Sequence, residues 1–126
     1  MPATDTAKEL ARTAAQAASD RLATDITAID VADNLVLTDA FVIASASNER
    51  QVHAVVDNIE EQLLRRHQIK PIRREGTGEN RWVLVDFGDI TVHVFHEDDR
   101  EYYGLDKLWG DCASIELPEF ETQNAQ

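Results

Sequence analysis

Histidines and carboxylates gather in one stretch of this chain, and both kinds of group can bind metal ions. His93 and His96 stand three residues apart and are followed at once by the acidic run Glu97, Asp98 and Asp99. On a strand, however, side chains three residues apart point to opposite faces, so the two imidazoles should not meet at one ion. We therefore expect no metal site and no cofactor.

Asp86 and Asp89 are a second candidate, because paired carboxylates hold the divalent metals of phosphoryl-transfer enzymes. Asp89 falls in a predicted tight turn, where aspartate is a common turn former, so the turn explains this residue better. For Asp86 the sequence leaves two interpretations open, a contact with a partner and a local salt bridge.

Two serines precede a predicted helix, which invites comparison with a phosphate-binding loop. Ser45 and Ser47 lie in a segment without glycine, and the chain contains no Gly-rich phosphate motif with its lysine. Helix capping is the commoner role for such serines. The only cysteine, Cys112, follows Asp111, whose charge disfavours a thiolate. Support for an enzyme is therefore thin.

The composition limits the class of protein. With 126 residues, 43% of them hydrophobic, the chain is long enough for one folded domain. Its formal net charge of −12 argues against broad contact with nucleic-acid phosphates. Basic residues outnumber acidic ones in residues 50–81, whereas residues 97–121 are strongly acidic. Such a surface favours a basic protein partner, unless the acidity serves only solubility.

A single cysteine excludes an internal disulfide, as expected for a reducing compartment. Neither a signal-peptide pattern nor an apolar run of membrane-spanning length occurs in the sequence. We expect a soluble, cytoplasmic protein that does not contact membranes.

The elements that position these residues centre on residues 82–95, WVLVDFGDITVHVF. Alternation of side-chain type on both sides of Gly88-Asp89 predicts a hairpin with those two residues in its turn. One face is then wholly apolar and should be core: Val83, Val85, Phe87, Ile90, Val92 and Val94. The other face, a mixture of apolar and polar groups, pairs Trp82 with Phe95, Leu84 with His93, and Asp86 with Thr91.

Periodicity predicts the remaining elements. Helices are expected over residues 4–22, 48–67 and 99–109, and strands over residues 26–31, 40–44 and 72–75. Expected caps are the Thr6–Glu9 capping box, Ser47 for the second helix, and Asp98 or Asp99 for the third. The order α-β-β-α-β-β-β-α predicts an α/β fold, a single mixed sheet with flanking helices. On the third helix, one apolar stripe should hold Tyr102, Leu105, Leu108 and Trp109.

Two segments of the chain closely resemble the ribosomal silencing factors, also called the Iojap family: DNLVLTDAFVIASASNERQV and NRWVLVDFGDITVHVFHEDDREYYGLDKLWGD. The family pattern contains VI-x-SG-x-S-x-R-Q-V in the first segment. In the second it contains W-x-(L/V)-(V/I)-D-(F/Y/L)-G-D and R-x-(F/Y)-Y-x-L-(D/E)-x-LW. The resemblance spans residues 6–111 and departs at Ala46, where many members have glycine. We expect one domain over residues 1–111 and an acidic, flexible tail over residues 112–126.

The resemblance implies a nucleotidyltransferase-like fold without catalytic residues, and a binding protein instead of an enzyme. Family members bind the large ribosomal subunit through ribosomal protein L14 (uL14) and sterically block association with the small subunit. They thereby repress translation when nutrients are scarce, and they are commonly homodimers. The alternatives are a metal-dependent, nucleotidyltransferase-like enzyme that uses Asp86 and Asp89, and a large-subunit assembly adaptor.

The mixed hairpin face and the segment after it are the candidate partner surface. We expect it to be drawn from Trp82, Leu84, Asp86, Thr91, His93, Phe95, Tyr102, Tyr103, Leu105, Leu108 and Trp109. Trp82 and Tyr103 are the first candidates for partner contact, because Trp and Tyr often anchor interfaces. The sequence does not divide the set among a ribosome-facing surface, a dimer interface and a second small core.

Overall fold

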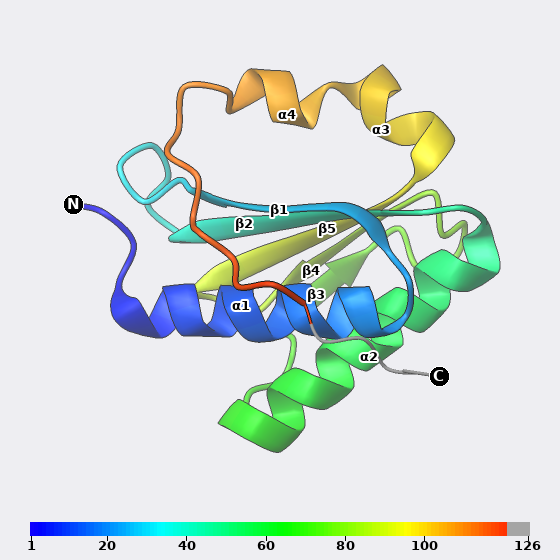
Figure 1. The fold of residues 1–126 in the computed structure, drawn as a ribbon, viewed down its shortest axis with the longest axis horizontal. Helices are drawn as coiled ribbons and strands as arrows, with labels where there is room; N and C mark the ends of the chain where they lie inside the picture. The colour runs from blue at the N-terminus through cyan, green and yellow to red at the C-terminus, as the bar shows by residue number, and fades with distance from the viewer. Residues whose placement is uncertain (121–126) are drawn as a thin grey trace.

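A computed structural model describes residues 1–120, which form three layers around one five-stranded sheet (Figure 1). The helices α1 and α2 cover one face, and α3 and α4 lie over the other. The elements are α1 Asp5–Asp20, β1 Thr24–Asp30, β2 Ala40–Ala46, α2 Glu49–His67, β3 Arg73–Glu75, β4 Trp82–Asp86, β5 Ile90–His96, α3 Glu97–Tyr103 and α4 Leu105–Leu108. The expected α/β fold with a single mixed sheet is confirmed. Within residues 1–120, no helix has both the length and the apolarity to cross a bilayer.

The strand order is β1-β2-β5-β4-β3, and only β2 and β5 pair in parallel. The hairpin has the predicted register, with Trp82 opposite Phe95 and Leu84 opposite His93. The turn lies at Gly88, whose φ of +94° falls in the left-handed region that glycine adopts without a steric penalty. The period-2 pattern therefore fixed both the pairing and the faces of this hairpin.

The main core lies between the sheet and the helices α1 and α2. The α1 side facing it is built of alanines, including Ala7, Ala11, Ala14 and Ala18, all with 0% exposure. Small side chains let the helix come close to both the sheet and α2, and Asn58 of α2 donates a buried hydrogen bond to a carbonyl of α1 at 2.9 Å. The alanine stripe thus serves packing within the chain.

The helix caps differ from those that the sequence suggested. Thr4, not Thr6, caps α1, since its hydroxyl accepts from the backbone N–H three residues on, at 3.1 Å. Asn48, not Ser47, caps α2 and accepts from the N–H of Gln51 at 2.8 Å. In both cases the cap is the last residue with extended backbone before the first helical turn, which capping geometry requires.

The predicted last helix is broken in two. Gly104 has φ +65° and ends α3, and a separate short helix, α4, begins at Leu105. The N-cap of α3 is His96, whose Nδ1 accepts from the backbone N–H of Asp98 at 3.1 Å, so neither expected aspartate caps it. The single apolar stripe is wrong for the same reason: Leu105 is 8% exposed, whereas Tyr102 is 81% exposed.

The segment after α4 returns to the domain. The backbone N–H of Ile115 donates to the carbonyl of Ala28 in β1 at 2.8 Å, and the backbone N–H of Asp30 donates to the carbonyl of Ala113 at 2.8 Å. Ile115 is buried in the main core, with Leu117 and Phe120 packed against that core. Residues 113–120 therefore belong to the packed domain, in contrast to the flexible tail expected from residue 112. Residues 121–126 lie outside the described residues.

Candidate functional site

On the sheet face opposite α1 and α2, α3 and α4 leave a groove beside β4 and β5. Helix α3 contacts β5 and β2, and beneath α3 and α4 lies a second small core. Phe95 is 0% exposed and Leu105 8% exposed, so these two candidates are core residues. Trp109 packs at the edge of the same core, its ring meeting that of Phe41 edge-on with centroids 5.5 Å apart. Three of the predicted surface residues therefore attach α4 to the sheet.

An aromatic stack leads from this core to the surface. The ring of Trp82 stacks on Phe95 with centroids 4.9 Å apart and contacts Tyr103 at 4.7 Å. Tyr103 meets Tyr102 edge-on at 5.1 Å. Exposure rises outward along this order, because Phe95 is buried, Trp82 is half-buried, and Tyr103 and Tyr102 are exposed. We call these four residues the aromatic stack. Leu108, on α4, adds another exposed apolar side chain.

His93 lies beside the stack and is nearly enclosed. It is 3% exposed, and its Nδ1 accepts a hydrogen bond from the indole N–H of Trp82 at 3.1 Å. The ring of Phe41 approaches it edge-on at 4.7 Å. Burial lowers the pKa of the imidazole to about 4, because removal from water disfavours the charged form. His93 is therefore neutral at neutral pH.

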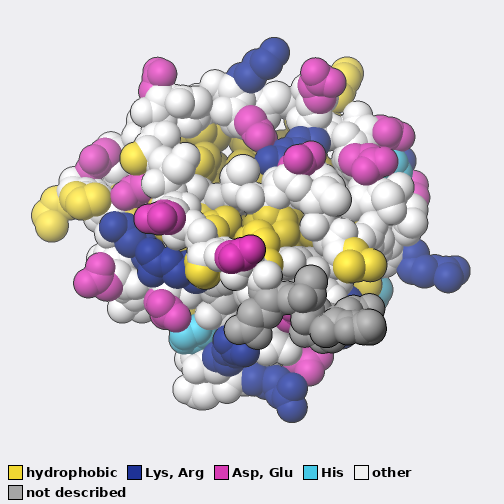
Figure 2. Space-filling view, viewed as in Figure 1, with side chains coloured by type: hydrophobic (Ala, Val, Ile, Leu, Met, Phe, Trp, Pro, Cys, Tyr) yellow, Lys and Arg dark blue, Asp and Glu magenta, His cyan; other side chains and the backbone are white. Residues whose placement is uncertain are grey.

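A groove of ≈ 370 Å³ continues from His93 over the uncovered part of the sheet. Its lining includes Leu84, Asp86, Thr91 and His93 from the hairpin, together with residues 35–38 of the β1–β2 loop. Figure 2 shows apolar side chains projecting where Figure 1 places that loop, at the left of the view. We call this feature the groove.

Two residues of that loop were missed by the sequence analysis. Val36 and Leu37 are 99% and 88% exposed and line the groove. Their signal was present, since adjacent apolar residues in an otherwise polar connection are unusual unless something covers them. No periodicity links them to the hairpin, so the sequence alone did not place them beside it.

Asp86 forms local contacts inside the groove. Its carboxylate accepts from the N–H of Gly88 at 2.8 Å and lies 3.9 Å from the guanidinium of Arg73. The local salt bridge, one of the two interpretations of this residue, is therefore present. Asp89 lies in the turn, as predicted, and its backbone carbonyl accepts from the N–H of Asp39 at 2.9 Å. Within residues 1–120, no group of three or more His, Cys, Asp or Glu side chains is placed to hold a metal ion.

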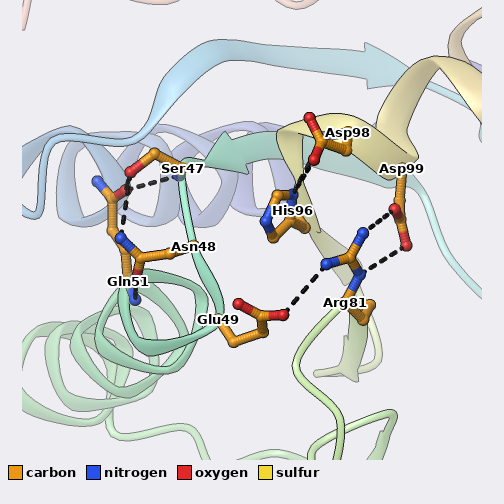
Figure 3. A network of polar contacts seen from close by, with 8 residues as sticks. All are labelled: Ser47, Asn48, Glu49, Gln51, Arg81, His96, Asp98 and Asp99. Atoms are coloured by element: carbon orange, nitrogen blue, oxygen red, sulfur yellow. Dashed lines mark hydrogen bonds and ion pairs between the residues drawn. The ribbon is translucent and has the colours of Figure 1, made fainter.

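A polar network fixes α3, and with it the outer end of the aromatic stack (Figure 3). The guanidinium of Arg81, just before β4, binds Asp99 of α3 through two nitrogens at 2.5 and 3.1 Å. It also binds Glu49, at the start of α2, at 3.1 Å. Arg81 lowers the pKa of Asp99 below its usual range, and the pKa of Glu49 is lowered first by a backbone hydrogen bond to its carboxylate and then by Arg81. The network joins α2, β4 and α3 at one point.

A second arginine holds the same helix from the other side. Arg100 of α3 donates to the hydroxyl of Ser45 at 2.9 Å and to the carboxylate of Asp106 at 2.9 Å. Ser45 is thus a partner of Arg100, and Ser47 donates to the side-chain oxygen of Gln51 at 2.7 Å. Both serines therefore form structural contacts with helices, but neither is the helix cap that the sequence favoured, since Asn48 caps α2.

The fold and this surface define a class: small α/β proteins with one mixed five-stranded sheet and an apolar groove on the face opposite α1 and α2. The family model described as "Ribosomal silencing factor during starvation" matches residues 4–126. The chain belongs to the family of ribosomal silencing factors.

Individual relatives agree with this assignment. The chain is 42% identical over 110 residues to "Ribosomal silencing factor RsfS" of Bacillus subtilis, covering 87% of this chain and 92% of that protein. It is 34% identical over 106 residues to the mouse protein "Mitochondrial assembly of ribosomal large subunit protein 1", covering 82% of this chain but 44% of that protein. A crystal structure of a Chromobacterium violaceum protein superposes with a TM-score of 0.77 at 30% identity, over 94% of each chain.

Proposed function

We propose that this protein represses translation by binding the large ribosomal subunit through ribosomal protein uL14 and thereby sterically blocking association with the small subunit. The observation that carries the proposal is the exposed aromatic stack beside an apolar groove, in a chain that belongs to the ribosomal silencing factors. The action is occlusion and needs no catalytic step.

The surface has the physical character of a protein-binding site. Tyr and Trp side chains contribute large contact areas at low entropic cost, and Tyr102 and Tyr103 are 81% and 50% exposed. Val36, Leu37 and Leu108 add apolar area that water solvates poorly. Burial of these groups against a partner would supply the main favourable contribution to binding.

The charge of the chain supports a protein partner on the ribosome over an RNA partner. A net charge of −12 is repelled by the phosphates of ribosomal RNA and attracted by basic ribosomal proteins. Acidic side chains are spread over the face seen in Figure 2. Such a distribution confines the footprint to protein surface.

Cytoplasmic location and a homodimeric state are part of the same proposal. Both follow from the family resemblance, and sedimentation of the purified protein measures the second. A dimer that uses the aromatic stack for its own interface would have to dissociate before binding the ribosome through that surface.

The test is co-sedimentation of the purified protein with isolated large subunits, followed by addition of small subunits. We expect the protein to pellet with large subunits and to lower the yield of joined ribosomes in proportion to its occupancy. An absence of pelleting contradicts the proposal.

A second candidate function is that of a large-subunit assembly adaptor. It is favoured by the name of the mouse relative, which refers to assembly of the large subunit. The same experiment separates the two functions. An adaptor would pellet with large subunits or their precursors without changing the yield of joined ribosomes.

A further inference from the structure

His93 carries an unused hydrogen-bond donor at the edge of the groove. Its Nδ1 accepts from Trp82, so in the neutral ring the proton sits on Nε2. Among the described residues, Nε2 has no hydrogen-bond partner, although His93 is only 3% exposed. Buried donors without acceptors are rare because they lose the hydrogen bond that water would provide. Such a donor calls for an explanation.

The neighbours of His93 do not supply the missing acceptor. The ring of Phe41 lies edge-on to the imidazole at 4.7 Å, and an aromatic ring is at best a weak acceptor. The nearby hydroxyl of Thr91 donates to that of Thr38 at 3.2 Å, and Thr38 donates in turn to the backbone carbonyls of Ala40 and Asp89, so neither hydroxyl is bonded to Nε2. Nε2 is therefore left without an acceptor among the described residues.

The groove next to this donor has the character of a peptide-binding site. Its volume of ≈ 370 Å³ lies at the lower end of the range of ligand sites and fits a few residues of an extended chain. Leu84 and the exposed Val36 and Leu37 provide apolar contact. Asp86 and Arg73 both line the groove and lie 3.9 Å apart, so their charges are balanced there, and the carboxylate of Asp86 can still accept hydrogen bonds from N–H groups of an extended chain.

We infer that the groove receives an extended segment of the ribosomal protein partner, that its docking uncovers His93 Nε2, which is sealed from solvent in the free protein, and that Nε2 then donates a hydrogen bond to a backbone carbonyl or hydroxyl oxygen of that segment. An apolar side chain of the segment lies against Val36, Leu37 and Leu84, and the carboxylate of Asp86, paired with Arg73, accepts from its N–H groups. The inference rests on the proposed function and adds to it. His93 becomes a specificity-determining residue, because a partner without an oxygen at this point leaves a buried donor unpaired.

Two neutral substitutions separate the donor from the other roles of His93. His93→Asn keeps an oxygen where Nδ1 accepts from Trp82 but has no donor at the position of Nε2. His93→Gln reaches that position with an N–H. Binding of each variant to isolated large subunits is titrated by co-sedimentation, with thermal unfolding as the control for folding. We expect His93→Asn to bind about three- to tenfold more weakly than His93→Gln, as the loss of one hydrogen bond implies.

A second pair of variants tests the groove without touching a buried residue. Val36→Asp places a charge on the groove wall at a side chain that is 99% exposed, so folding should be unaffected. Leu22→Asp is the matched control, since Leu22 is 78% exposed and follows α1 in the opposite layer. We expect Val36→Asp to weaken binding to large subunits by about tenfold or more, and Leu22→Asp to leave it unchanged.

The outcomes are distinguishable. Equal binding by His93→Asn and His93→Gln overturns the role of the donor, and equal binding by Val36→Asp and Leu22→Asp overturns the groove as a binding site. If a His93 variant fails to fold, the comparison of Val36→Asp with Leu22→Asp decides whether the groove is a binding site. If the wild-type protein itself does not pellet with large subunits, the proposed function has failed, which is seen before any variant is compared.

Discussion

The indole N–H of Trp82 donates to Nδ1 of His93 at 3.1 Å, a diagonal contact between neighbouring strands β4 and β5. This one bond orients both rings. It holds the indole flat on Phe95 and under Tyr103, and it determines which nitrogen of His93 carries the proton. The aromatic stack and the groove thus share a common support, and changes to either residue are expected to affect both.

Removal of the outer ring of the stack tests the partner surface. We expect Tyr103→Ala to weaken binding to large subunits about tenfold or more, because a half-exposed aromatic anchor is lost. Its stability should change little, since half of the side chain is already in water. Co-sedimentation and thermal unfolding measure the two quantities. Unchanged binding would remove the stack from the proposed interface.

The inner ring should show a mixed effect. Trp82→Ala is expected to abolish binding to large subunits and also to lower the free energy of unfolding by roughly 1–3 kcal/mol, because the indole packs on Phe95 and Tyr103. Trp82→Phe keeps much of the packing and removes the N–H, so it should bind better than the alanine variant. Equal binding by Trp82→Ala and Trp82→Phe would show that the ring packing that Trp82→Phe retains does not contribute to binding.

Stability should depend on pH through His93. The imidazole has a folded-state pKa of about 4 against an ordinary value of 6.5, so the unfolded chain binds more protons between these values. The free energy of unfolding therefore rises with pH across this window. Between pH 7 and a pH below 4, the titration of His93 lowers the free energy of unfolding by roughly 3 kcal/mol. Asp99, with its lowered pKa, contributes stability that is lost only at lower pH, as its own carboxylate becomes protonated.

Urea denaturation at several pH values between 7 and 4 measures this dependence. The groups that surround His93 are Trp82, Phe41, Thr91, and the Asp86–Arg73 pair of the groove. His93→Gln has no titrating group at this position and should lose most of the slope between pH 6.5 and 4. The same slope in wild type and variant would assign the pH dependence to other residues.

The network at Arg81 should control the order of α3. Arg81→Ala removes the contacts to Asp99 and Glu49, and we expect faster amide hydrogen exchange in α3 together with weaker binding to large subunits. Arg81→Lys keeps the charge but not the two-nitrogen contact, so amide exchange in α3 of this variant should be faster than in the wild type and slower than in Arg81→Ala. Exchange rates in α1 serve as the internal control. If α3 exchanges at the wild-type rate in Arg81→Ala, other contacts hold it.

Two glycines of the loop before β4 make a matched pair for stability. A Cβ on Gly76 would overlap the carbonyl oxygen of Trp82, and its φ of +85° disfavours any L side chain. A Cβ on Gly78 meets nothing within 4 Å. We expect Gly76→Ala to lower the free energy of unfolding by about 2 kcal/mol or more, and Gly78→Ala to change it far less. Chemical denaturation of both variants checks this, and equal stability would contradict the predicted clash.

Much of the fold was readable from local patterns. The hairpin register, the fully buried strand β2 and the packing of the alanine face of α1 all follow from side-chain periodicity, since each depends on residues near one another in the chain. The division between an apolar hairpin face and a mixed one was predictable for the same reason. Membership of the silencing-factor family was likewise carried by contiguous motifs.

The use of the mixed face was decided only by the tertiary structure. Gly104 turns the chain so that Leu105 and Trp109 fold back onto the sheet while Tyr102 and Tyr103 remain exposed. The β1–β2 loop brings Val36 and Leu37 to the groove, and residues 113–120 pack along β1 and α1. Periodicity assigns a side chain to a face, but whether that face becomes core or surface depends on which distant segment covers it. Packing between residues far apart in the sequence determines whether a sheet face is core or surface. The same packing encloses His93 and leaves its Nε2 without a partner.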